Sequence, residues 1–73
     1  MSLGFQFDDL QVFCLAARKA SFAAAAAELG MSPAYVSKRI AVLEAALGVT
    51  LFHRHARRVS ITEAGERVYA SAQ

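Results

Sequence analysis

Residues that cross-link small proteins are nearly missing from this chain of 73 residues. Its single cysteine, Cys14, excludes an intramolecular disulfide and a zinc cluster of several cysteines. One free thiol fits a reducing compartment such as the cytosol. A chain of this length forms one small domain, which buries only ~60% of its unfolded surface. Its stability must therefore come from close packing.

Long apolar runs are also missing. No stretch approaches the ~20 residues needed to span a bilayer, and the start "MSLGFQFDDL" lacks the features of a signal peptide. The apolar share of 56% includes much alanine, which favours a compact helical domain. We therefore expect a cytoplasmic protein.

Catalytic and metal-binding patterns are absent as well. There is no Gly-rich phosphate loop and no nucleophile beside a base, so an enzyme with a cofactor is not expected. His53 and His55 could share a strand face, but no further ligands accompany them, so a metal site is not expected either. Cys14 is interpreted as buried filler in an apolar helix. The glutamates are dispersed and are interpreted as solvated: Glu28, Glu44, Glu63 and Glu66.

The net positive charge is small, but it is concentrated in one segment. The net charge is +2, yet residues 38–58 hold five of the eight basic residues and only one of the six acidic ones. Such a block is typical of a phosphate-binding surface, and a solvated charged loop is the alternative.

The first two predicted helices are short. Asp8 as N-cap with Gln11 predicts a helix over about 9–18. Ser21 as N-cap, the alanine run and Gly30 as the left-handed terminator predict a second helix over about 22–29. We expect Ala26 to face inward, while some of the other alanines face solvent.

The third helix has the clearest signals. Ser32 followed by Pro33 predicts its start, and Gly48 predicts its end, which gives a helix over about 33–47. Its apolar stripe consists of Val36, Ile40, Leu43 and Leu47. The short turn before it is typical of a helix-turn-helix.

The remaining residues complete a winged helix-turn-helix, a mainly α fold. Runs of β-forming residues predict a hairpin over about 49–54 and 58–62. Thr62 then starts a fourth helix at Glu63, which the end of the chain interrupts. We expect a domain over 1–62 and the start of a linker helix over 63–73.

The stripe leaves a small, polar and basic face on the third helix. Ala34, Lys38, Ala41 and Ala45 should point away from the core, with Ser37 on the flank. An α-helix fits the major groove, where its N-terminal residues meet base edges. The alternative is that Ser37 and Lys38 are ordinary solvated surface.

Phosphate contacts are expected around this face. Ser32 and Ser21 stand at helix starts, where free N–H groups attract anions. Arg54, Arg57 and Arg58 lie on or beside the hairpin tip and can reach the backbone or the minor groove.

The run from Ser21 to Gly65 resembles the DNA-binding domain of LysR-type transcriptional regulators. The matching residues follow in order and without gaps: Ser21-Phe22, Leu29, Ser32, Ser37-Lys38, Ile40, Leu43-Glu44, Leu47-Gly48, Leu51-Phe52, Arg54 and Ile61-Thr62-Glu63-Ala64-Gly65. The resemblance implies base or backbone contacts from Pro33, Ala34, Ser37 and Lys38, and a wing contact from Arg54.

Two departures from the family pattern concern the third helix. Pro33 replaces a frequent glutamine, which shifts readout toward Ser37, Lys38 and contacts with thymine methyl groups. Arg39 also stands where glutamine is frequent, and it adds charge near the DNA backbone. The role of Tyr35 is left open between sideways packing and a phosphate contact.

The resemblance further implies a bacterial regulator that acts on double-stranded operator DNA at the nucleoid. It implies a homodimer through the linker helix, weakened in a chain that lacks most of that helix and the effector-sensing domain. The rival interpretations are a different winged-helix transcription factor and a winged helix used for protein–protein contact. The second rival requires a large apolar patch on the third helix, which Ala34, Ser37, Lys38 and Ala41 do not supply.

Overall fold

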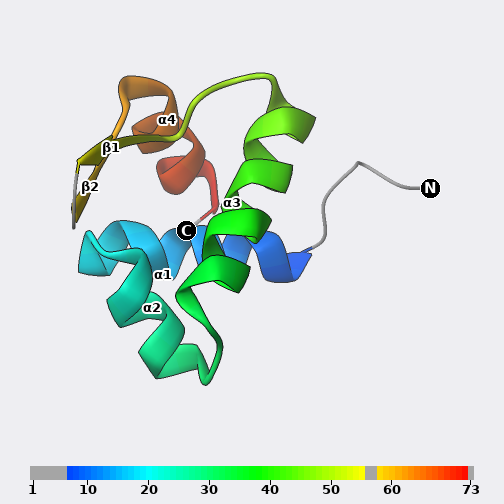
Figure 1. Cartoon of the computed structure of the whole chain (residues 1–73). Coiled ribbons are helices and arrows are strands. Elements are labelled where there is room, and N and C mark those ends of the chain that lie inside the picture. Colours follow the sequence, from blue (N-terminus) through cyan, green and yellow to red (C-terminus); the bar gives the residue numbers. More distant parts are fainter. Residues whose placement is uncertain (1–6, 56–57, 73) are drawn as a thin grey trace.

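Three helices, a β-hairpin and a fourth helix follow one another in the computed structural model, which describes residues 7–55 and 58–72. Helices α1 (Phe7–Lys19), α2 (Phe22–Leu29) and α3 (Pro33–Leu47) precede strands β1 (Phe52–His55) and β2 (Arg58–Ile61) and helix α4 (Glu63–Ala72). In Figure 1, α3 crosses α1, and the hairpin extends to one side of the helices. The predicted winged helix-turn-helix is confirmed.

The bounds of α2 and α3 agree with the prediction because their caps are local. The Oγ of Ser21 accepts the N–H of Ala24 at 3.1 Å, and that of Ser32 accepts the N–H of Tyr35 at 3.1 Å. Gly30 and Gly48 end the two helices with φ angles of +71° and +72°, which glycine adopts without steric cost.

The predicted start of α1 is wrong. Asp8 lies within the first helical turn, because the helix already includes Phe7, so Asp8 cannot act as the N-cap. Asp8 and Asp9 still place negative charge where the helix dipole favours it. At the other end of α1, Ala20 has a left-handed φ of +53°, which is uncommon for a residue with a Cβ.

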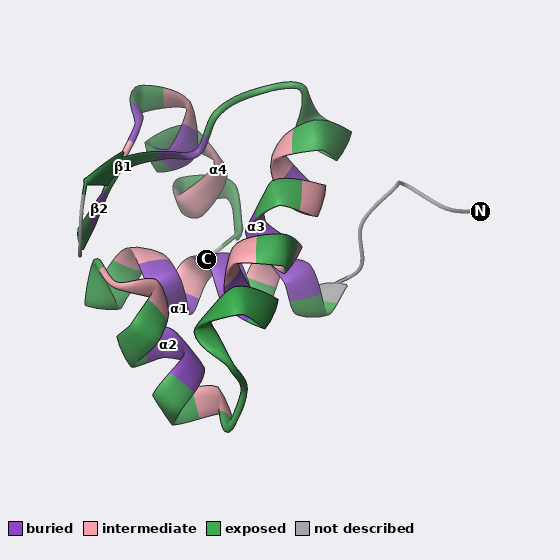
Figure 2. Ribbon diagram, in the orientation of Figure 1, coloured by how far each residue is buried: buried purple, intermediate pink, exposed green. Residues whose placement is uncertain are grey.

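The core lies between the three N-terminal helices and the hairpin (Figure 2). Its largest fully buried side chains are Phe13, Val36, Ile40, Leu43 and Leu51. The ring of Phe52 lies 5.4 Å from the ring centroids of both Phe13 and Phe22, which joins the hairpin to α1 and α2.

One prediction about apolar residues needs correction. Ala26 is buried as expected, and Ala25 is buried beside it, whereas Ala23, Ala24 and Ala27 are exposed. Leu47 is 36% exposed, because the last turn of α3 extends past the core that covers Val36, Ile40 and Leu43. All four residues of the stripe were predicted to face inward, but the helix is longer than the core on which it packs.

The hairpin is shorter than predicted. Antiparallel pairing runs from Phe52↔Ile61 to His55↔Arg58, so residues 49–51 lie outside the strands. The N–H of Leu51 bonds to the carboxylate of Glu44 at 2.7 Å, so it is unavailable to a partner strand. Thr62 caps α4 as predicted: its Oγ1 accepts the N–H of Gly65 at 2.9 Å and donates to the carbonyl of Thr50 at 2.6 Å.

Candidate nucleic-acid interface

The outward face of α3 is small and basic, as the sequence predicts. Ala34, Lys38, Ala41 and Ala45 are exposed, whereas Val36, Ile40 and Leu43 on the opposite side have no exposed surface. Lys38 forms no ion pair with any described residue, so its ammonium group is available to a partner. A face without bulky side chains allows the helix backbone to approach the floor of a major groove.

The N-terminal end of α3 has the capping residues that the sequence predicts. Pro33 occupies the first turn, and Ser32 caps it with its hydroxyl oxygen. Because the oxygen of Ser32 accepts a backbone N–H, its hydrogen is free to donate. Ser21 caps α2 in the same way. Both serines cap helix starts, and their phosphate contacts stay predictions.

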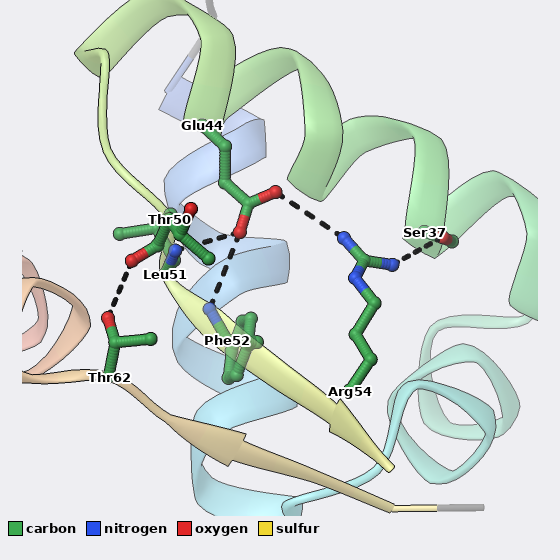
Figure 3. A network of polar contacts seen from close by, with 7 residues as sticks. All are labelled: Ser37, Glu44, Thr50, Leu51, Phe52, Arg54 and Thr62. Atoms are coloured by element: carbon green, nitrogen blue, oxygen red, sulfur yellow. Dashed lines mark hydrogen bonds and ion pairs between the residues drawn. The ribbon is translucent and has the colours of Figure 1, made fainter. Parts of the chain in front are cut away.

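Arg54 on β1 points toward α3 rather than away from the domain (Figure 3). Its Nη1 donates to the Oγ of Ser37 at 3.0 Å, and its Nη2 lies 3.4 Å from the Oε1 of Glu44. The guanidinium also lies 5.1 Å from the ring centroid of Phe22. One arginine therefore joins the hairpin, α2 and α3.

The other basic residues of the hairpin are arranged differently. Arg58 on β2 is exposed and has no ion pair within residues 7–55 and 58–72. Arg57, also predicted to contact DNA, lies outside the described residues. His55 pairs with Arg58 in the ladder, and its Nε2 lies 3.1 Å from the Oγ of Ser60. A free cation thus remains at the edge of the hairpin.

Arg39 is held against α1. Its Nε lies 2.9 Å from the Oδ1 of Asp9, and its Nη2 donates to the Oδ2 at 3.3 Å. The Nε–H itself makes no hydrogen bond among the described residues, so the contact at Nε is one of charge alone. Asp9 is 3% exposed. The pair holds α3 against α1. It also leaves the Arg39 side chain less free to contact DNA than the sequence suggests.

Residues 7–66 match the model of the bacterial regulatory helix-turn-helix proteins of the lysR family. The chain belongs to this family. The HTH-type transcriptional regulator DmlR of Escherichia coli K12 is 65% identical over 66 residues, which are 90% of this chain and 22% of DmlR. The HTH-type transcriptional activator TtdR of the same strain is 52% identical over 64 residues, which are 88% of this chain and 21% of TtdR.

Solved structures of LysR-type proteins have the same fold. The CbnR DNA-binding domain in its DNA complex superposes with a TM-score of 0.90 at 34% identity, covering 93% of this chain and 78% of that one. The BenM DNA-binding domain with catB site 1 DNA gives a TM-score of 0.87 at 31% identity, covering 93% and 76%. This chain spans about a fifth of the length of the curated relatives it matches.

Tyr35, whose role the LysR pattern leaves open, lies at the exposed start of α3. Its side chain is 44% exposed, and the Arg39 guanidinium lies 6.0 Å from its ring centroid. This contact is sideways packing along the helix.

Glu44 is the residue that sequence reasoning missed. It was interpreted as solvated, but its side chain is only 17% exposed. Its Oε2 accepts the N–H groups of Leu51 and Phe52 at 2.7 and 3.4 Å, and its Oε1 faces Arg54. The sequence feature that could have indicated this role is the basic Arg54 ten positions after Glu44. It indicates a contact only if the hairpin is known to fold back onto α3.

Cys14 is half-buried rather than fully buried, and this burial raises the pKa of its thiol, with Arg18 lowering it to a smaller extent. A raised pKa keeps the thiol neutral and weakly nucleophilic near pH 7. Within the described residues, no group of three or more His, Cys, Asp or Glu side chains could hold a metal ion. No helix among them is long and apolar enough to cross a membrane.

Proposed function

We propose that this LysR-type domain binds double-stranded DNA sequence-specifically, with α3 in the major groove and the hairpin on the flanking backbone or minor groove. The outward face of α3, with exposed Ala34, Lys38 and Ala41, is the observation that supports this most directly. The CbnR and BenM domains, which share its fold, were solved in complexes with DNA.

The proposed contacts divide by their chemistry. Ser37 and Lys38 face base edges, together with apolar contacts from Pro33 and Ala34. Ser21, Ser32 and Arg58 reach phosphates. A phosphate contact by Arg57 stays a prediction from the sequence. Arg39 and Arg54 pair with Asp9 and Glu44, and we propose that they hold α3 in place rather than contact bases.

The wider role follows from the family. We propose that residues 1–62 form the DNA-binding domain and residues 63–73 begin a linker helix through which two copies form a homodimer. The relatives are transcriptional regulators, which supports a regulator rather than an enzyme, acting on operator DNA at the nucleoid in the bacterial cytoplasm.

Selection from a pool of random duplexes at fixed salt tests the proposal. An enriched inverted repeat is expected, because two copies related by a two-fold axis read two half-sites. An enriched single half-site supports specific binding and contradicts dimeric binding by this chain. Absence of any enriched sequence contradicts the proposal and favours a winged helix used for protein–protein contact.

Two substitutions separate base contacts from phosphate contacts. Lys38→Ala should weaken binding and change base preference at one position. Arg58→Ala should weaken binding to all sequences equally and reduce the slope of log K against log salt by about 0.9. Arg67→Ala is the matched control, because it removes an exposed charge on α4 that already pairs with Glu63. If Lys38→Ala and Arg58→Ala bind like this control, the docking geometry is wrong.

A further inference from the structure

The guanidinium of Arg54 is contacted on three sides, although its side chain is 45% exposed. Ser37 and Glu44 take its two terminal nitrogens, and the ring of Phe22 covers it (Figure 3). Glu44 cannot turn away easily, because its second oxygen is held by the backbone N–H groups of Leu51 and Phe52. Arg54 therefore donates to Ser37 in the domain without DNA bound.

This contact decides how the Ser37 hydroxyl can be used. A guanidinium has only donors, so the Ser37 oxygen must act as the acceptor in their 3.0 Å bond. The hydroxyl hydrogen then points elsewhere, and no described residue accepts it. Ser37 is partly exposed on the flank of the outward face of α3, so its O–H is left to donate to a partner lying against that helix.

We propose that Arg54 fixes Ser37 as a hydrogen-bond donor in the DNA interface, so that Ser37 selects a base that presents an acceptor in the major groove. The acceptors there are the N7 of purines, the O6 of guanine and the O4 of thymine, whereas cytosine presents an amino donor. Arg54 is then a positioning residue that acts on specificity through Ser37. This inference rests on the proposed placement of α3 in the major groove.

The charge of Glu44 beside Arg54 predicts a salt dependence of DNA affinity that differs from that of a phosphate contact. Its charge is opposed by Glu44, whose Oε1 lies 3.4 Å away. Arg58 has no such partner among the described residues. Because the slope of affinity against salt counts the phosphates that a protein neutralises, loss of Arg54 should leave the slope unchanged, whereas loss of Arg58 should reduce it.

The test uses this chain and the duplex enriched from the random pool. The position that Ser37 reads is the one where Ser37→Ala changes base preference. There, a 7-deazapurine in place of a purine, or an analogue lacking O4 in place of thymine, should weaken the parent about three- to tenfold, the effect of one hydrogen bond. The same analogue should leave Ser37→Ala unaffected.

Arg54 is tested at the same position with two variants. Arg54→Ala and Arg54→Lys should both lose the preference there with an unchanged salt slope, because lysine keeps the charge but not the planar fork. Combining Arg54→Ala with Ser37→Ala should add no further loss of preference. Arg58→Ala, the control, should keep the preference and reduce the slope.

Three results would overturn the inference while leaving the proposed function standing. If Arg54→Lys keeps the preference, or if Arg54→Ala reduces the salt slope as Arg58→Ala does, Arg54 is a phosphate contact. Equal weakening at every position would identify a role in folding alone. Absence of any sequence-specific binding by the parent would instead contradict the proposed function itself.

Discussion

The carboxylate of Glu44 on α3 joins this helix to the start of the hairpin, because it accepts the backbone N–H of Leu51 at 2.7 Å. The same oxygen lies 3.4 Å from the N–H of Phe52, where β1 begins. Glu44 thus supplies the acceptor for backbone donors that no strand pairs, at the point where the chain leaves α3 and turns into the wing.

Glu44→Ala should destabilise the domain by about 1–3 kcal/mol, the cost of leaving buried donors without an acceptor. Urea unfolding followed by circular dichroism measures the change in the free energy of unfolding. The control is Glu63→Ala, because Glu63 is 82% exposed and forms only a surface pair with Arg67, worth about 0.3–0.5 kcal/mol. Equal losses for the two variants would show that the Leu51 contact contributes little.

Asp9→Asn tests the pair that fixes α3 on α1. The substitution keeps the shape of the buried side chain but removes the charge opposite Arg39, which is 27% exposed and can be partly solvated. We expect a loss of about 1–3 kcal/mol, below the full cost of breaking a wholly buried pair. Asp8→Asn is the matched control, since exposed Asp8 shares the first turn of α1 and hence the helix dipole. A loss no larger than that of the control would contradict a role for the pair.

The features that could be predicted from the sequence are those set by neighbouring residues. Ser21, Ser32 and Pro33 start helices through contacts within one turn, and Gly30 and Gly48 end them, so α2 and α3 have the predicted bounds. The small outward face of α3 followed from the same helical spacing.

The features that could not be predicted depend on residues far apart in the chain. Asp9 meets Arg39 across 30 positions, and Glu44 meets the hairpin only because the chain reverses after Gly48. Nothing in the spacing distinguishes these carboxylates from solvated ones such as Glu63. The start of β1 was misplaced for the same reason, since the Glu44 contact takes the N–H of Leu51 away from the strand ladder.

Ala26→Leu should destabilise the domain by about 1–3 kcal/mol, because a buried methyl-sized space would have to hold three more carbon atoms. Ala26 is 1% exposed in the segment where α2 faces the core, and Ala25 beside it has no exposed surface. Thermal unfolding of Ala26→Leu, and of Ala25→Leu beside it, should show lower midpoints than the parent. Ala24→Leu, at an exposed position of the same helix, should leave the midpoint nearly unchanged. A similar midpoint for the Ala24 and Ala26 variants would contradict close packing of α2.

Ala20→Gly should stabilise the domain, in contrast to most substitutions by glycine. Ala20 is exposed and has a φ of +53°, a conformation that disfavours any residue with a Cβ and suits glycine. The substitution keeps the carbonyl that accepts the N–H of Val59 at 3.4 Å and removes no buried surface. Relief of the backbone strain, reduced by the greater flexibility of glycine in the unfolded chain, should raise the free energy of unfolding by about 0.5–1 kcal/mol. Ala41→Gly, at an exposed position inside α3, should lower it by about 1 kcal/mol. The two variants therefore move urea midpoints in opposite directions, and a loss of stability in both would show that the backbone at Ala20 is not strained.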